Sequence, residues 1–182
     1  MNFRPLLIGL AAGQRSMTPL AAVALAARAG GLAPGNGAPS FLGGRCVVVG
    51  ATLLAVGEIL GDKMNSAPDR TVPPGLAARL ISGGLAGAAM APRALRGRAA
   101  ALGAVGAVVG GYAGLALRKR AMRRYGQRRS GLVEDVLTLA ATALITASAA
   151  RAPERRRSGR PGRPTEPPSS MLWGRRRAPS PG

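Results

Sequence analysis

The sequence predicts an all-α fold, a polytopic bundle of membrane helices, from its composition and from a series of apolar segments. The chain has 182 residues and is 47% hydrophobic but only 3% aromatic. A soluble core usually draws volume from large aromatic side chains, whereas small residues let membrane helices approach closely. About four to five apolar segments follow one another along the chain. The alternative is a soluble, alanine-rich helical bundle.

The first apolar segment, Pro5 to Ala27, is interrupted by the polar stretch "GQRSMTP". Proline removes a helical hydrogen bond, and Gly13 and Ser16 favour a turn before it. We therefore expect this helix to break near Arg15–Pro19. Interrupted membrane helices expose helix ends and backbone groups that can hold ions or polar substrates.

A helix needs about 20 apolar residues to cross a bilayer, and only one of the later segments is that long. Ala99–Leu117 is long enough and carries no charged residue. The others must tilt, bury their charges within the bundle or enter without crossing. They are Cys46–Gly61, Leu76–Ala91 and Val136–Ala150.

Composition changes sharply at residue 151, which predicts a membrane helical domain over 1–150 and a tail over 151–182. The tail is rich in Arg, Pro, Gly and Ser and cannot bury enough apolar surface to offset the entropy of ordering. We expect it to be disordered. Its arginines either contact anionic lipid or nucleic acid or simply keep the tail soluble, and no specific nucleic-acid partner is predicted.

A basic stretch, "RKRAMRRYGQRR" at Arg118–Arg129, joins the fourth and fifth segments and contains seven cations and no acid. We interpret it as a cytoplasmic loop by the positive-inside rule, in contact with anionic lipid. If the last segment crosses once, this loop and the basic tail lie on opposite sides. Either one segment is re-entrant or the tail is exported, so charge alone leaves the topology open.

The residue inventory excludes several kinds of chemistry. The chain has no His, and its single Cys, Cys46, lies in an apolar run. An intramolecular disulfide, a Cys/His metal site and catalysis by a histidine base are therefore impossible. We expect no cofactor, no metal site and no enzymatic activity.

Glycine spacing predicts where helices pack closely. Gly106, Gly110 and Gly114 are four residues apart and so share one helix face, open to a neighbouring helix or to a second copy of the chain. The same spacing recurs in the third and second segments, at Gly83 and Gly87 and at Gly57 and Gly61.

Charged residues in the second segment are the candidate functional centre. Glu58 and Asp62 are four apart and face the same way on a helix, and a charge at membrane depth needs a partner. The candidate partners are Arg15, Lys63, Arg70 and Arg79.

Two further groups of charges have an alternative interpretation. Glu134 and Asp135 precede the last segment, where acids favour a helix N-terminus, so we expect them to cap that helix. Lys63 and Arg70 either bind a phosphate or lipid head group or are solvated loop charges.

Three stretches, "GLAAGQRSMTPLA", "GEILGDKMNSAPDRTVPPGLAARLISGGLAGAA" and "VEDVLTLAAT", resemble the bacterial membrane-protein family called domain of unknown function 4126. The resemblance spans roughly Leu6 to Ala150 and implies a multi-pass protein of the inner membrane, with no defined reaction. The residues that match the family pattern are Arg15, Ser16, Glu58, Asp62, Lys63, Pro68, Arg70, Thr71, Glu134 and Asp135.

Two classes of function follow. In a small ion- or proton-coupled transporter or channel, the buried acids act as coupling sites. In a structural or accessory membrane protein, the same charges only stabilise the bundle, which then acts alone or as a homo-oligomer in the lipid bilayer. A membrane enzyme ranks last, because only carboxylates are available as base or nucleophile.

Overall fold

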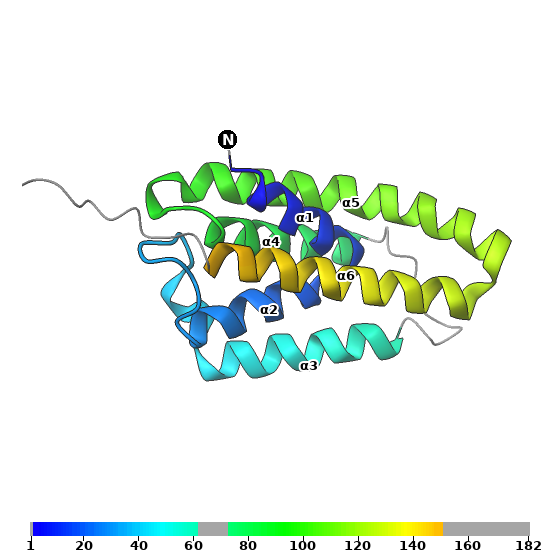
Figure 1. The fold of residues 1–182 in the computed structure, drawn as a ribbon, viewed down its shortest axis with the longest axis horizontal. Helices are drawn as coiled ribbons and strands as arrows, with labels where there is room; N and C mark the ends of the chain where they lie inside the picture. The colour runs from blue at the N-terminus through cyan, green and yellow to red at the C-terminus, as the bar shows by residue number, and fades with distance from the viewer. Residues whose placement is uncertain (1, 62–72, 151–182) are drawn as a thin grey trace, which may run out of the picture. The chain divides into compact units, whose positions relative to one another are not determined.

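The computed structural model describes residues 2–61 and 73–150, and Met1–Ala152 forms one compact unit. All regular elements of the described residues are helical, which confirms the all-α prediction (Figure 1). The predicted tail at 151–182 lies outside the described residues. The elements are α1 (Arg4–Gln14), α2 (Met17–Arg28), η1 (Ser40–Gly43), α3 (Arg45–Gly61), α4 (Pro73–Ala89), η2 (Arg93–Leu95), α5 (Arg96–Tyr125) and α6 (Gln127–Ala150).

The first apolar segment is two helices, as the sequence predicts, and the break is at Arg15. Arg15 has an extended backbone, with φ −139° and ψ 113°, between the end of α1 and the start of α2. Pro19 is the third residue of α2. The first N–H groups of a helix have no acceptor within it, so Pro19 removes no hydrogen bond there.

The basic stretch Arg118–Arg129 is helical, so the prediction of a loop is wrong. α5 continues to Tyr125, and α6 begins at Gln127 after the single residue Gly126. Arg, Lys, Ala and Met are all good helix formers, and their charge does not prevent a helix. Gly126 has φ 81°, a conformation that residues with a side chain rarely adopt.

Helix α5 packs between α1 and α4 through glycines. A Cβ placed on Gly106 would lie 2.6 Å from the carbonyl oxygen of Leu6, and Gly110 meets the backbone of Leu10 in the same way. On the α4 side, a Cβ on Gly83 would lie 2.7 Å from that of Ala107. Backbone-to-backbone approach of this kind is possible only where side chains are absent.

Helices α2, α3 and α6 complete the unit. α3 packs on α2, and α6 contacts α1, α2 and α5 (Figure 1). Glycines of α3 behave differently from those of α5, because a Cβ on Gly50, Gly57 or Gly61 would meet open space. The predicted packing face of the second segment therefore contacts no other helix among residues 2–61 and 73–150.

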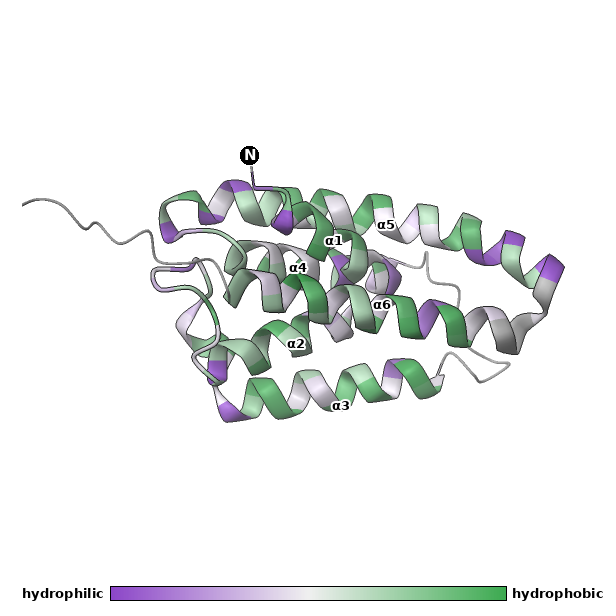
Figure 2. Ribbon diagram, in the orientation of Figure 1, coloured by the Kyte–Doolittle hydropathy of each residue, from purple (hydrophilic) through white to green (hydrophobic). Residues whose placement is uncertain are grey.

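Small and polar residues form much of the interior together with a cluster that includes Ile8, Val23 and Leu42, while many other large apolar residues face outward. Figure 2 shows hydrophobic colouring over much of the helices and a hydrophilic C-terminal end of α5. Arg15, Arg79 and Ser82 are buried. Exposed large side chains occur on every α-helix, and they include Leu7, Leu25, Leu53, Leu54, Leu60, Ile81, Val105, Val109, Val136 and Leu144.

Two helices of the described residues are long and apolar enough to cross a membrane. They are Arg93–Arg124, which includes η2 and most of α5, and Ser130–Ala150 in α6. The larger number of crossings stays a prediction.

Candidate functional site at the helix break

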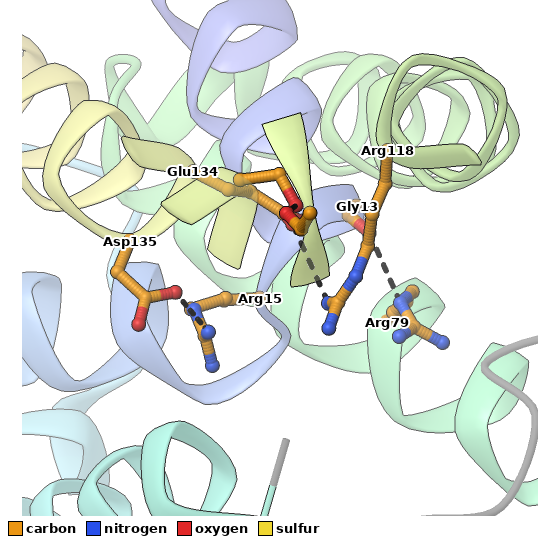
Figure 3. Close-up of polar contacts among 8 residues, drawn as sticks. Gly13, Arg15, Arg79, Arg118, Glu134 and Asp135 are labelled. Carbon is orange, nitrogen blue, oxygen red and sulfur yellow. Dashed lines mark hydrogen bonds and ion pairs between the residues drawn. The ribbon is translucent and has the colours of Figure 1, made fainter. Parts of the chain in front are cut away.

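Arg15, at the break between α1 and α2, forms a buried ion pair with α6. Its Nη2 donates to Oδ1 of Asp135, and both residues are more than nine-tenths buried (Figure 3). The extended backbone of Arg15 ends α1 and lets its side chain reach sideways to α6. Separation of the pair would leave a buried charge without its partner, which is costly, so this contact holds α6 against the break.

Glu58 of α3 caps the N-terminus of α2. Its carboxylate accepts hydrogen bonds from the Ser16 amide at 2.9 Å, the Ser16 hydroxyl at 3.1 Å and the Met17 amide at 3.0 Å. Helix N-termini have exposed amides and a partial positive charge, which favour an anion. Glu58 is only half-buried, so this anion is in reach of the surroundings of the bundle.

Arg79 of α4 binds the other end of the break. Its Nε donates to the carbonyl oxygen of Gly13 at 3.1 Å (Figure 3). Gly13 lies in the last turn of α1, where carbonyls lack helical partners and the partial charge is negative. The two helix ends therefore meet side chains of opposite charge, a cation at the end of α1 and an anion at the start of α2.

A second ion pair joins α5 to α6. Arg118 Nη1 lies 3.4 Å from Glu134 Oε2, and each side chain is mostly buried (Figure 3). Although Glu134 and Asp135 are neighbours in sequence, they serve different pairs because successive residues of a helix point in different directions.

Helix α6 turns a polar face inward. Thr138, Thr142 and Thr146 follow Asp135 at helical spacing and are all buried. The Thr146 hydroxyl donates to the carbonyl oxygen of Thr142 at 2.8 Å. Within the described parts of the chain, the buried hydroxyls of Thr142 and of Thr18 in α2 have no hydrogen-bond partner, and such groups are uncommon in folded proteins.

A cavity of about 770 Å³ lies between α1, α5 and α6, and Gln14, directly before the break, is one of its lining residues. Its lining is overwhelmingly apolar, and neither Glu58 nor Asp135 is among its lining residues. The polar side chains that line it are Gln14, Arg118, Ser130, Glu134 and Thr138.

The sequence-predicted site residues fall into three groups. Arg15, Ser16, Glu58, Arg79 and Asp135 converge on the break. Glu134 belongs to the separate pair with Arg118. The remaining candidates lie outside the described residues, and they are Asp62, Lys63 and Arg70, together with Pro68 and Thr71 of the family pattern.

The capping role predicted for Glu134 and Asp135 is wrong. α6 begins at Gln127, so both acids lie in its second and third turns, beyond the N-terminal amides.

Sequence reasoning gave Arg15 as one of four candidate partners for Glu58 and Asp62, whereas the structure pairs Arg15 with Asp135. It also missed Thr18, Thr142 and Arg118. The spacing of Asp135, Thr138 and Thr142 within an apolar segment is a signal that indicates an inward polar face.

The arrangement can stabilise anions and cations at helix ends, but it offers no metal site within the described residues, where no cluster of three or more Cys, Asp or Glu is suitably placed. Comparison with known proteins finds no matching family model, no matching curated protein and no matching solved structure.

Proposed function

We propose that this chain is a polytopic protein of the bacterial inner membrane. The distribution of residues supports the proposal, because many large apolar side chains on every α-helix face outward while Arg15, Arg79 and Asp135 face inward. Soluble proteins rarely expose such extensive apolar surface, and membrane bundles turn ionisable residues toward their interior.

The proposal includes four to five apolar segments in the bilayer. α3 and α4 have 17 residues each and are therefore about 26 Å long, against a hydrocarbon core of about 30 Å. α5 and α6 are long enough without tilt or thinning. The positive-inside rule places their basic turn in the cytoplasm. This organisation is the one expected from the resemblance to domain of unknown function 4126, and we propose that the chain belongs to that family.

Within this membrane protein, we propose that the helix break is the centre of a small ion- or proton-coupled transporter. The observation that carries the proposal is the contact of the Glu58 carboxylate with the first amides of α2. Discontinuous membrane helices commonly present such helix ends to ions and substrates. A proton on Glu58 would remove the negative charge from this helix end, and an external anion could then replace it.

Ion flux into proteoliposomes tests the proposal. Under an inward pH gradient, we expect the wild type to move protons together with at least one of chloride, nitrate, phosphate or a small carboxylate. Glu58→Gln keeps shape and one acceptor oxygen but loses the charge, so it should fold normally and abolish this flux. Gly57→Ala is the matched control, since a Cβ there meets open space, and it should transport like the wild type.

A second candidate function is structural, and one observation favours it. Both ends of the break already meet opposite charges, and the cavity between α1, α5 and α6 does not include Glu58. A cluster of this kind can serve only to fix the helices. In that case no ion would move, and Glu58→Gln would lower the melting temperature in detergent.

A further inference from the structure

The cavity between α1, α5 and α6 has the form of a groove for an alkyl chain. Its apolar lining includes Leu7 and Leu10 of α1, Leu117 of α5, and Val133, Leu137 and Ile145 of α6. Cavities of about 300–1,000 Å³ with mainly apolar walls are typical of sites for small ligands. At about 770 Å³, this one is large enough for a sizeable apolar group.

The groove is long along the helices. Its lining on α6 extends from Ser130 to Ile145, which is about 22 Å at the rise of an α-helix. One leaflet of the hydrocarbon core is about 15 Å thick, half of the whole core. The groove can therefore hold an acyl chain along the full depth of a leaflet.

The end of the groove near the α5–α6 turn is basic. Ala121 and Ser130 line the end near the α5–α6 turn, and Arg124 continues the face of α5 that carries Leu117 and Ala121, because these residues are four and three apart. Arg120 and Arg124 are both exposed there. The stretch Arg118–Arg129 contains seven cations and no acid, so this end is positive although the Arg118–Glu134 pair in the wall is neutral overall.

We propose that the groove binds one acyl chain of an anionic phospholipid, with the lipid phosphate at the arginines that end α5. The inference rests on the proposed membrane location but not on transport. Apolar walls favour an acyl chain, and exposed cations near a membrane surface attract an anionic head group. The ligand class is thus phosphatidylglycerol or another anionic glycerophospholipid.

Thermal unfolding of the full chain in detergent, with added lipid, tests the proposal. Phosphatidylglycerol should raise the melting temperature by several degrees, whereas phosphatidylcholine and inorganic phosphate should not. Equal shifts with phosphatidylcholine, or an equal shift with phosphate alone, would overturn it. Native mass spectrometry should also show one retained phosphatidylglycerol.

Matched variants separate the two halves of the site. Ala141 lines the groove and is exposed, so Ala141→Phe should fill the groove and remove the phosphatidylglycerol shift, while Ala143→Phe, also exposed but outside the lining, should retain it. Arg120→Gln with Arg124→Gln should reduce the shift, and Arg96→Gln with Arg98→Gln at the other end of α5 should not. A shift unchanged in both test variants would refute the groove as the lipid site.

The failure of the lipid site is distinguishable from failure of the proposed location. Recovery of the chain from cells in the soluble fraction would refute the membrane location and the lipid site together. Recovery in the membrane fraction without a selective phosphatidylglycerol shift would refute the lipid site alone.

Discussion

Helices α1 and α2 contact their neighbours in two ways, through close backbone packing on one side and through charged side chains on the other. Toward α5, α1 makes backbone contacts at Gly106 and Gly110, where no atom can be added. Toward α3, α4 and α6, the break makes charged contacts through Glu58, Arg79 and Asp135. The glycine side depends on shape and suits a rigid scaffold. The polar side depends on charge, so protonation or a bound ion can alter it.

The largest effect is expected where a buried charge loses its partner. Arg15→Ala strands Asp135 on α6, and loss of one partner of a buried pair costs about 3–5 kcal/mol. Arg118→Ala breaks the pair with Glu134, whose contact is longer at 3.4 Å and whose side chains are slightly more exposed, so it serves as the comparison and should cost less than Arg15→Ala. Denaturant unfolding in detergent measures both values. Equal losses would show that burial of the Arg15 pair does not matter.

A smaller loss of stability is expected on the glycine side. Gly110→Leu forces side-chain atoms against the backbone of Leu10, and overpacking typically costs about 1–3 kcal/mol. Gly57→Leu has the same chemistry on the open face of α3 and should change stability by less than about 0.5 kcal/mol, as surface changes do. If Gly110→Leu melts like wild type, α5 does not pack on α1 through this face.

The next effect concerns the capping carboxylate. Glu58→Ala removes the acceptor for two amides and a hydroxyl, and loss of an N-terminal cap costs about 0.5–2 kcal/mol. Glu58→Gln should cost less, because its single amide oxygen can still accept from the Ser16 amide and hydroxyl, although Met17 then loses its acceptor. A comparison of melting temperatures for the two variants checks this order. A larger loss for Gln than for Ala would contradict the capping role.

The sequence predicts local features of this molecule well. Pro19 and the polar stretch before it reveal the break, and four-residue spacing reveals the glycine face of α5. Both depend on residues close together in the chain. The basic stretch misled the prediction, because charge was taken as a sign of a loop although Arg, Lys, Ala and Met favour a helix.

Which side chains pair across the bundle was harder to predict than which residues share one face of a helix. Arg15 and Asp135 are 120 residues apart, and their pairing depends on how α6 packs on the break. Glu58 was recognised as a buried acid in need of a partner, but backbone amides were not considered as that partner. Glycine spacing also gave no indication that Gly57 and Gly61 face no other helix in the described part of the chain, since the same pattern occurs on packed and open faces.

Hydrogen–deuterium exchange at the Ser16 and Met17 amides tests most directly whether Glu58 controls the helix break. In Glu58→Ala, both amides should exchange about 2–30 times faster than in wild type, which is the range that corresponds to a cap of about 0.5–2 kcal/mol. Amides in the middle of α5 should keep their protection, because the glycine side does not depend on this carboxylate. Unchanged exchange at Ser16 and Met17 would contradict the account, since Glu58 would then not hold the N-terminus of α2.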